Sequence, residues 1–440
     1  MKDWIVLSGL VALSAACSGT PSVHSANASV GGSGENSTGG ASATGAAQAG
    51  QGGDIGTWTE APGSCPSGMT QVDITTESEL ESASRGEDGY ASDPPSICYF
   101  LHAGTYIQNG STLGMYVRKG GADALHRRVF VGERRSTVIV KSRATIDSGV
   151  SHVQLSNLTF DLTGYAQTGS FNTLSLLDGS TDLRSAQVTF TGDCATGANG
   201  GHIEIDGSTD VIVEDCLIEK FGRCGPSGHQ DHGVYLANGS NLTLRNNEIR
   251  GNASRGIQFN TEGGDYGTLD SVVIERNRIH DNGHEDYEDG IVMNATGTGT
   301  ISNVTVQNNL IYHNYYSGLR ESGDVFQSIV IRNNTFFDNG AASSAAGRSE
   351  LNLDDVGSGA ASTVTRNIIV ATSAILNNCY DAQPRGYSLI DNVSQGTVPI
   401  GVAGNCVSGS VSVDPAFVNA TNSDFHPTSA AVNGYGAYAL

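Results

Sequence analysis

Two segments of this chain bring histidine together with carboxylates, and a third places an arginine between them. They are GHQDHG at residues 228–233, HEDYED at residues 284–289 and SRG at residues 254–256. Carboxylate oxygens suit hard divalent cations such as Ca²⁺, and a histidine, arginine or tyrosine nearby can take or give a proton. These side chains could therefore combine cation binding with general acid–base catalysis.

The candidate residues divide into two roles. The carboxylates that we expect to bind a cation are Asp231, Glu288 and Asp289. The residues that we expect to transfer a proton or contact a substrate are Arg255, His232, Arg320 and Tyr235. Further polar residues are expected near these groups. They are His229, His284, Glu285 and Asp286 in the loops and Gln258 on the adjacent strand.

Each assignment has a structural alternative. Asp231 and Asp289 could cap the turns that lead into Gly233 and Gly290. The histidines could be solvated loop residues, and the acidic cluster could bind a structural cation without catalysis. Glu321 falls at a frame position where apolar residues point inward, so it is either at a strand end or an unusual buried carboxylate.

These segments interrupt a repeat that runs through residues 241–340. Its frame is apolar-x-apolar-x-x-Asn-x-apolar-x-x-Asn, and copies recur about every 25–34 residues in both directions. The first frame asparagines are Asn247, Asn277, Asn309 and Asn334, and the second are Asn252, Asn282, Asn314 and Asn339. Self-similarity of this kind marks units that bury their apolar faces only by stacking. Short apolar runs with 58 glycines favour strands and turns over helices.

Strand alternation and stacking predict where the side chains of each unit lie. A period of two places Val272 and Ile274 inward, with Val273 and Glu275 outward. The repeated asparagines should form amide ladders that satisfy buried backbone groups at the turns. One outward row is expected from Glu214, Arg245, Glu275, Gln307, Arg332 and Arg366, of which the first three alternate in the sign of their charge. Loop insertions in a solenoid gather on one rim, where we expect GHQDHG and HEDYED to flank Arg255.

The segments RNNEIRGN and RNNTFFDN resemble the right-handed parallel β-helix of the pectate-lyase-like superfamily. The resemblance covers roughly residues 100–434, including VDPAFVNATNSDFHPTSAAVNGYG, which is similar to that superfamily's closing segment. It implies an all-β, single-stranded, right-handed parallel β-helix solenoid with an N-terminal cap. One solenoid hosts many activities, so the motif informs on the fold more than on the reaction.

The same resemblance implies a reaction through position alone. Ca²⁺-dependent pectate lyases place acidic residues and a catalytic arginine on one face of parallel strands. In this chain the corresponding strand of each unit begins after the second frame asparagine. By that analogy the protein is a Ca²⁺-assisted lyase that cleaves an acidic, uronate-containing polysaccharide by β-elimination, with Arg255 or Arg320 as the base. Such a reaction neutralises the C6 carboxylate, removes the C5 proton and protonates the leaving oxygen. No diagnostic signature of those enzymes occurs in this sequence.

Two other functions stay open. A non-catalytic surface protein that binds glycans or mediates adhesion would suit the polar N-terminal segment and the missing catalytic signature. A β-helix glycoside hydrolase is the second alternative. By resemblance, the polygalacturonases of this fold use GHG and RIK segments, and this chain has DHG and no RIK. Inverting hydrolysis would need two carboxylates about 6.5–9.5 Å apart.

The formal net charge of −22 bears on the partner. Such a surface repels nucleic acids and anionic lipid head groups, so no nucleic acid is expected. An acidic polysaccharide would have to meet local cations, either arginine or Ca²⁺. We expect a monomer that touches a membrane only through an N-terminal lipid anchor.

The N-terminal sequence MKDWIVLSGLVALSAACSGT resembles a bacterial lipoprotein signal, with LSAAC as the lipobox and Cys17 as the lipidated residue. An ordinary secretory signal is the alternative. Either predicts export, and Ser18 favours the outer membrane by resemblance to the lipoprotein sorting rule. We expect an outer-membrane lipoprotein or an extracellular protein.

The domain boundaries follow from composition. We predict a signal peptide at residues 1–16, a flexible Gly/Ala/Ser segment at 17–56, an N-terminal cap with the first strands at 57–150 and the β-helix with its closing segment at 151–440. A short helix is expected near residues 77–84. Export permits disulfides, for which the nearest-neighbour pairs are Cys65 with Cys98, Cys194 with Cys224, and Cys379 with Cys406. Cys216 occupies a ladder position and should be a buried free thiol.

Overall fold

A computed structural model describes most of the chain after residue 59. The described residues are 60–89, 96–107, 114–164, 174–177, 179–193, 203–222, 231–261, 267–284, 288–295, 298–323, 326–343, 348–356, 363–371, 375–378, 388–396, 407–408 and 411–439. They all belong to the second of two units, residues 50–440. The predicted signal, the segment after it and Cys17 lie outside the described residues.

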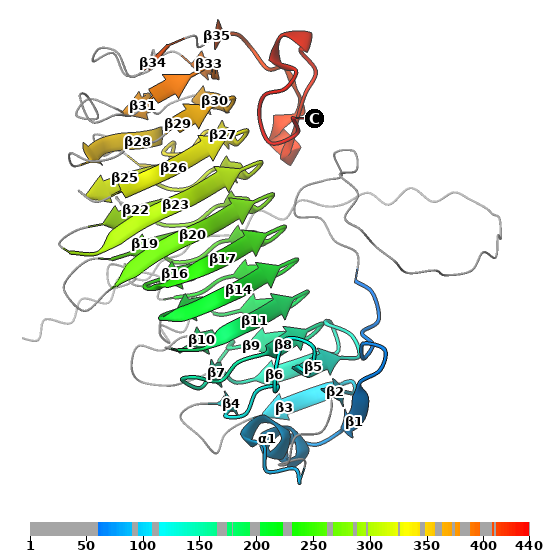
Figure 1. The fold of residues 1–440 in the computed structure, drawn as a ribbon. Coiled ribbons are helices and arrows are strands. Elements are labelled where there is room, and N and C mark those ends of the chain that lie inside the picture. The colour runs from blue at the N-terminus through cyan, green and yellow to red at the C-terminus, as the bar shows by residue number, and fades with distance from the viewer. Residues whose placement is uncertain are drawn as a thin grey trace, which may run out of the picture. The chain divides into compact units, whose positions relative to one another are not determined.

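Three long parallel sheets form the body of this unit (Figure 1). Within the described ranges, sheet A has 13 strands, sheet B has 12 and sheet C has 10, and the chain visits the sheets in turn before returning one rung further along. Equivalent strands of successive rungs are therefore neighbours, as in the pair β17 and β20. The predicted right-handed parallel β-helix is confirmed.

The strands have the following bounds. Sheet A consists of β1 (Thr70–Ile74), β2 (Ile97–Leu101), β5 (Arg128–Gly132), β8 (Val153–Ser156), β11 (Thr181–Ala186), β14 (Ser208–Glu214), β17 (Gly239–Arg245), β20 (Thr268–Glu275), β23 (Thr300–Gln307), β26 (Phe326–Arg332), β29 (Thr363–Thr365), β32 (Ser388–Ile390) and β34 (Val407–Ser408). Sheet B consists of β3 (Gly104–Ile107), β6 (Val138–Lys141), β9 (Thr159–Asp161), β12 (Thr189–Thr191), β15 (Leu217–Glu219), β18 (Glu248–Arg250), β21 (Arg278–His280), β24 (Leu310–Tyr312), β27 (Thr335–Phe337), β30 (Ile368–Ala371), β33 (Val393–Gly396) and β35 (Val411–Ser412). Sheet C consists of β4 (Met115–Val117), β7 (Ala144–Ile146), β10 (Leu174–Leu176), β13 (Ile203–Ile205), β16 (Val234–Leu236), β19 (Ile257–Asn260), β22 (Ile291–Ala295), β25 (Ser317–Gly323), β28 (Ser349–Val356) and β31 (Ile375–Asn378).

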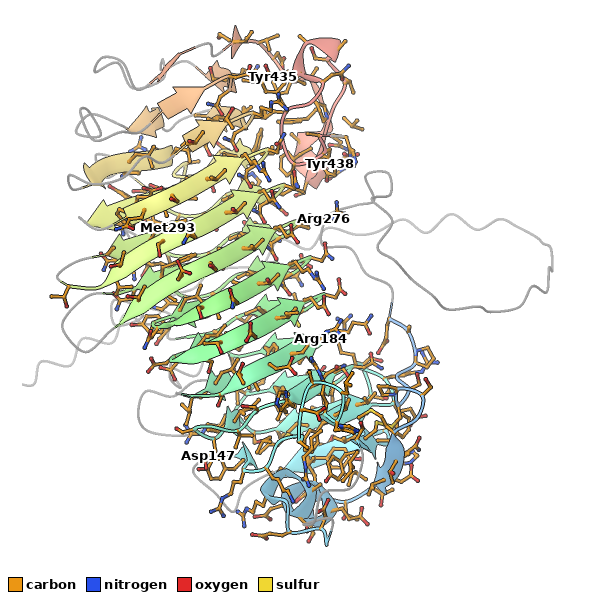
Figure 2. All side chains as sticks on the ribbon, in the orientation of Figure 1. Asp147, Arg184, Arg276, Met293, Tyr435 and Tyr438 are labelled. Carbon is orange, nitrogen blue, oxygen red and sulfur yellow. A yellow bond between two sulfur atoms is a disulfide. The ribbon has the colours of Figure 1, made fainter. Side chains whose placement is uncertain are left out.

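The core is one continuous apolar column inside the three sheets. On β20, Val272 and Ile274 are buried while Val273 and Glu275 are partly exposed, as strand alternation predicts. Met293 of β22, labelled in Figure 2, is fully buried in the same column. Each rung adds its inward residues to those of the next rung, so the core lengthens with the repeat.

Two asparagine ladders run along the turns, as the repeat predicts. In the first ladder Asn309 donates from Nδ2 to the Ile274 carbonyl and to the Asn334 Oδ1 atom, each at 2.9 Å. In the second, Asn282 donates to the Asn314 Oδ1 atom at 3.0 Å. The second ladder ends on a fully buried carboxyl group, because the Asn339 backbone N–H donates to the Glu350 Oε1 atom at 2.9 Å.

Left-handed residues precede the ladder positions. Asn246 (φ 54°), Arg276 (φ 55°) and Asn308 (φ 56°) each come one residue before a ladder asparagine. This conformation bends the chain sharply at a single residue. Asparagine adopts it more readily than most residues. The turn residue aims the next side chain inward, where the ladder forms.

The charged row on sheet A exists with one correction. Glu214, Arg245, Glu275, Gln307 and Arg332 are successive register partners. Arg245 and Arg184 both pair with Glu214, and Figure 2 labels Arg184 on this sheet. The prediction that Arg366 continues the row is wrong, because Thr365 is the partner of Arg332 and Arg366 occupies the left-handed turn position after it.

Both ends of the described body carry extra structure. Helix α1 (Glu77–Arg85) has a capping box at Thr76 and buries Leu80 and Ala83, in agreement with the predicted helix. Near the other end, η2 (Ala420–Asn422), η3 (Ala430–Val432) and the antiparallel pair β36 (Phe417–Asn419) and β37 (Asp424–Pro427) follow the last parallel strands. Phe425 packs against Tyr312 and Phe337 of sheet B.

The cysteines agree with the prediction where they are described. Cys65 and Cys98 form a disulfide. Cys216 is a buried free thiol at the start of the first ladder, and burial raises its pKa to about 12. The other two predicted pairs lie outside the described residues. None of the helices in the described ranges has the length and apolar character of a membrane span.

Candidate functional site

Sheet C and the turn before it bring the predicted site residues onto neighbouring rungs. Backbone bonds from Gly233 to Arg255 and from Gly256 to Asp289 align the residue before each glycine. His232, Arg255, Asp289 and Ser317 therefore occupy one row, which we call the turn row. A second row, the strand row, points outward from sheet C and contains Tyr235, Gln258, Val292 and Arg320.

A buried ion pair connects the two rows. Arg320 donates from Nε to the Asp289 Oδ2 atom at 2.9 Å, and the Asp289 side chain is fully buried. Burial raises the pKa of the Asp289 carboxyl, while the positive charges of Arg320 and Arg255 oppose that rise. Two guanidinium groups therefore interact electrostatically with one buried carboxylate.

The neighbouring rungs supply a histidine and a tyrosine. The rings of His232 and Tyr235 stack with centroids 5.7 Å apart and planes 13° apart. The Tyr235 hydroxyl accepts a hydrogen bond from the Asn260 Nδ2 atom at 2.7 Å. Next to them, Arg255 donates from Nη1 to the Gln258 Oε1 atom at 2.9 Å. The predicted proton-transfer residues thus lie on neighbouring rungs, with His232 buried and with the buried Val292 between Gln258 and Arg320 in the strand row.

The three predicted cation ligands have different surroundings. Asp289 is committed to Arg320, and Glu288 accepts a hydrogen bond from the His284 backbone N–H at 2.7 Å. Asp231 is fully buried two rungs from Glu288, with Ser254 on the rung between them. The described part of the chain contains no group of three or more His, Cys, Asp or Glu side chains that could hold a metal ion. The predicted set Asp231, Glu288 and Asp289 therefore does not fit a Ca²⁺ site.

Glu321 occupies one of its two predicted positions, and two residues of the site were not predicted. Glu321 points inward beside Met293 and is fully buried, which settles its two predicted alternatives in favour of burial. Asn260 and Ser317 were not predicted. Period-two alternation could have identified Asn260, which follows Gln258 by two residues on the same face. Ser317 could have been found by aligning SGL with SRG and EDG. His229, Glu285 and Asp286 lie outside the described residues.

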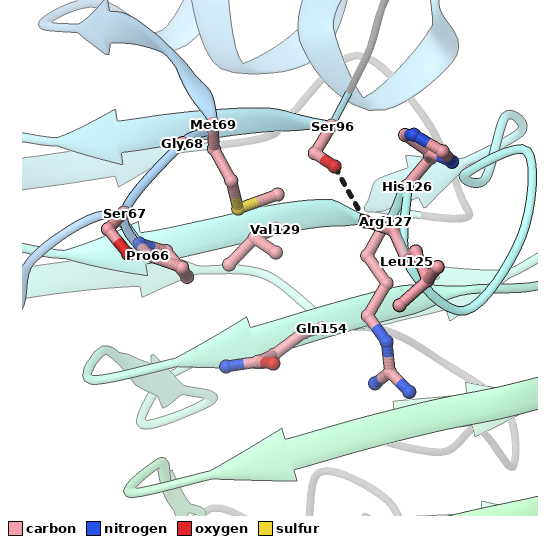
Figure 3. Close-up of a pocket in the computed structure, with 10 residues that line it drawn as sticks. All are labelled: Pro66, Ser67, Gly68, Met69, Ser96, Leu125, His126, Arg127, Val129 and Gln154. Atoms are coloured by element: carbon pink, nitrogen blue, oxygen red, sulfur yellow. Dashed lines mark hydrogen bonds between the residues drawn. The ribbon is translucent and has the colours of Figure 1, made fainter. Parts of the chain in front are cut away.

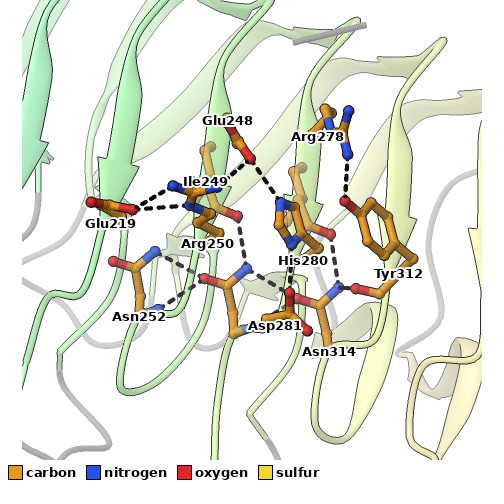
Figure 4. A network of polar contacts seen from close by, with 12 residues as sticks. Glu219, Glu248, Ile249, Arg250, Asn252, Arg278, His280, Asp281, Tyr312 and Asn314 are labelled. Carbon is orange, nitrogen blue, oxygen red and sulfur yellow. Dashed lines mark hydrogen bonds and ion pairs between the residues drawn. The ribbon is translucent and has the colours of Figure 1, made fainter. Parts of the chain in front are cut away.

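A second polar network lies on sheet B (Figure 4). Arg250 bonds both Glu219 and Glu248, each at 2.9 Å, and His280 contacts Glu248 at 3.2 Å. His280 also stacks on Tyr312 with centroids 4.5 Å apart. The charges of this network are matched across successive rungs, which is the arrangement expected of a stabilising cross-strand ladder.

The face on sheet C combines two arginines with a stacked histidine and tyrosine. The charges of Arg255 and Arg320 both act on the buried Asp289 carboxylate, and His232 and Tyr235 lie one rung from Arg255 and three rungs from Arg320. A guanidinium pair recognises a carboxylate through parallel N–H donors. A stacked imidazole and phenol can hold and move protons. The arrangement can therefore bind an anionic group and carry out acid–base chemistry beside it.

Comparison with known proteins supports the fold. A family model described as right handed beta helix region matches residues 148–319. No curated protein sequence matches this chain significantly.

Solved structures with similar folds include several carbohydrate-active proteins. The A-module of mannuronan C-5 epimerase AlgE6 from Azotobacter vinelandii aligns with a TM-score of 0.48 and 16% identity, over 77% of this chain and 95% of that one. A rhamnogalacturonan lyase aligns with a TM-score of 0.47 and 13% identity, over 79% of this chain and 90% of that one. The alginate lyase AlyGC of family PL6 aligns with a TM-score of 0.39 and 13% identity, over 83% of this chain and 56% of that one. Similarity of this extent does not inform on the reaction of this chain.

Proposed function

We propose that this chain is an exported, lipid-anchored protein that cleaves a uronate-containing polysaccharide by β-elimination on the outward face of sheet C. The observation that carries the proposal is the position of Arg255 and Arg320, whose charges both act on the buried Asp289, with Tyr235 and the His232 ring stacked on it one rung from Arg255. Export and lipidation at Cys17 rest on the sequence of the first 20 residues.

In this mechanism the arginines hold the C6 carboxylate of the sugar. Charge neutralisation lowers the pKa of the C5 proton, because the developing negative charge spreads into the carboxylate. Asp289 fixes the guanidinium of Arg320 and does not itself meet the substrate, since its side chain is fully buried. The buried pair therefore orients a substrate-binding group.

The proton transfers fall to Tyr235, which lies one rung from Arg255 and is partly exposed. Tyr235 removes the C5 proton, and the electron pair forms the C4–C5 double bond as the bond from C4 to the glycosidic oxygen breaks. Tyr235 then returns this proton to the leaving oxygen, while the buried His232 stacks on the Tyr235 ring and positions it. Asn260, which donates to the Tyr235 hydroxyl, orients that group.

A non-catalytic glycan-binding function is the second candidate. It is favoured by one observation: Arg255, Arg320 and Tyr235 already hydrogen-bond to Gln258, Asp289 and Asn260. Side chains held in this way form a preorganised surface, which benefits binding without requiring turnover.

One experiment separates the two candidates. Full-length protein is incubated with polymers of mannuronate, guluronate, galacturonate and glucuronate, and the ultraviolet absorbance of the unsaturated product is followed, with and without EDTA. Hydrogen exchange at C5 in D₂O detects proton removal without cleavage, and depletion from solution measures binding. Cleavage that survives EDTA supports the lyase with arginine neutralisation. Binding without product or exchange supports the binder, and neither binding nor product on any polymer contradicts both.

A further inference from the structure

A surface hollow lies on sheet A near α1, whereas the candidate site lies on sheet C. Its larger part is a cavity of about 410 Å³ between residues 66–69 and residues 125–129, with Gln154 at its floor (Figure 3). A second cavity of about 280 Å³ is lined by residues 62–64 and also by Gln154. Because both cavities include Gln154, they adjoin. We call the combined hollow, between residues 62–69 and strands β5, β8 and β11, the N-terminal groove.

The outer wall of this groove is fixed in place. The Cys65–Cys98 disulfide ties the wall to β2. The Gly63 backbone N–H donates to the Glu133 carbonyl at 2.8 Å, and the Asn157 side chain donates to the Ala61 carbonyl at 3.2 Å. The groove is therefore formed before any ligand arrives, which lowers the entropic cost of binding.

The lining suits a molecule with both apolar and hydroxyl faces. Pro66, Met69 and Val129 supply apolar surface, and Leu125 at the rim is 85% exposed. The Gln154 amide makes no hydrogen bond with any residue in the described ranges, so both its donor and its acceptor are available. Sugar rings present C–H faces to apolar side chains and hydroxyl groups to amides.

The charged groups of the larger cavity are already neutralised. Arg127 donates from Nη2 to Asp182 and from Nε to the Ala124 carbonyl at 3.1 Å. The Nδ1 atom of His126 lies 2.9 Å from the Asp123 carboxylate. Neither side chain offers an uncompensated charge to an anionic ligand.

At the smaller cavity Arg184 pairs with Glu214, and the remaining charged group of the lining, Asp215, is a carboxyl that does not favour an anionic ligand. We propose that the N-terminal groove binds an uncharged segment of a glycan chain, with Gln154 hydrogen-bonding ring hydroxyl groups and Leu125 packing on a sugar face. The N-terminal groove therefore favours an uncharged ligand, whereas Arg255 and Arg320 on the face of sheet C favour a carboxylate. The inference does not depend on catalysis at that face.

Titration calorimetry of the full-length protein tests the proposal. The probes are short oligomers of glucose, mannose and galactose, compared with short oligomers of galacturonate and mannuronate. The variants are Gln154→Ala and Leu125→Ala. Thr305→Ala is the matched control, because Thr305 occupies the same register row as Gln154 on β23. Arg255→Ala reports on the sheet C face.

We expect at least one neutral oligomer to bind at millimolar concentration or better. Gln154→Ala and Leu125→Ala should each weaken its binding by about fivefold or more, while Thr305→Ala and Arg255→Ala leave it unchanged. Three outcomes would overturn the proposal: no binding of any neutral oligomer, binding that Arg255→Ala abolishes and Gln154→Ala does not, or acidic oligomers that respond to Gln154→Ala more strongly than neutral ones. Melting temperatures of all variants show whether a loss of binding reflects unfolding.

Discussion

Arg320 on β25 and Asp289 at the turn before β22 form an ion pair with an N···O distance of 2.9 Å, although 31 residues separate them in the sequence. Parallel stacking makes this contact possible, because β22 and β25 are neighbours in sheet C. Asp289 is fully buried and only 15% of the Arg320 side chain is exposed. The pair gives the outward face of sheet C a fixed guanidinium group.

Replacing either arginine should remove most of the proposed activity. For Arg255→Ala and Arg320→Ala we expect the rate of unsaturated product formation to fall by about 10²–10³-fold, the usual effect of deleting a charge-stabilising donor. Arg332→Ala, on the exposed face of sheet A, is the matched control and should leave the rate unchanged. Activity of Arg255→Ala within a factor of about two of the wild-type rate would rule out its assigned role.

Removal of Asp289 should destabilise the fold. Asp289→Ala leaves the guanidinium of Arg320 partly buried without its counterion, and we expect a loss of about 3 kcal/mol in the free energy of unfolding. Urea denaturation measures it. The double variant Asp289→Ala/Arg320→Ala should recover part of the loss, because the guanidinium of Arg320 is removed together with its counterion. A loss in the double variant equal to the sum of the losses in Asp289→Ala and Arg320→Ala would show that the pair is not energetically coupled.

The carboxyl group of Glu350 should make stability depend on pH. Burial raises its pKa well above the ordinary value of 4.5. A raised pKa in the folded state contributes stability that is complete below pH 4.5 and is lost as pH rises through the folded pKa. Glu350→Gln does not titrate, so the melting temperature of the wild type relative to this variant should decline as pH rises.

Thermal melts of both proteins across the range from about pH 4 to about pH 8 measure this difference. Glu87→Gln serves as a control for the change in net charge. A difference between wild type and Glu350→Gln that stays constant over the range would mean that Glu350 does not titrate there with a shifted pKa.

Interrupting a ladder should cost more than an exposed substitution. Asn309 makes hydrogen bonds to Asn277, Asn334 and the Ile274 carbonyl. Asn309→Ala leaves several of these buried groups unsatisfied, and we expect a loss of roughly 3 kcal/mol by urea denaturation. Thr243→Ala, on the outward face of sheet A, should change stability by less than about 0.5 kcal/mol. Similar losses in the free energy of unfolding for the two variants would show that the ladder does not stabilise the fold.

The amino-acid sequence by itself determined the repeating parts of this protein. The asparagine frame predicted both ladders, and period-two alternation predicted that Val272 points inward and Val273 outward. These features are local: each rung repeats the same backbone bonds, so one copy predicts the next. The buried free thiol at Cys216 followed from its ladder position for the same reason.

Only the tertiary structure decided which side chains meet between rungs. The pairing of Arg320 with Asp289, and of Asn260 with Tyr235, depends on side-chain directions in turns and strands that no periodicity constrains. The predicted cation ligands show the same limit, because Asp289 binds an arginine that its own segment does not contain. The N-terminal groove also needed the fold, since its wall and its floor at Gln154 are brought together by a disulfide and by backbone contacts across sheet A.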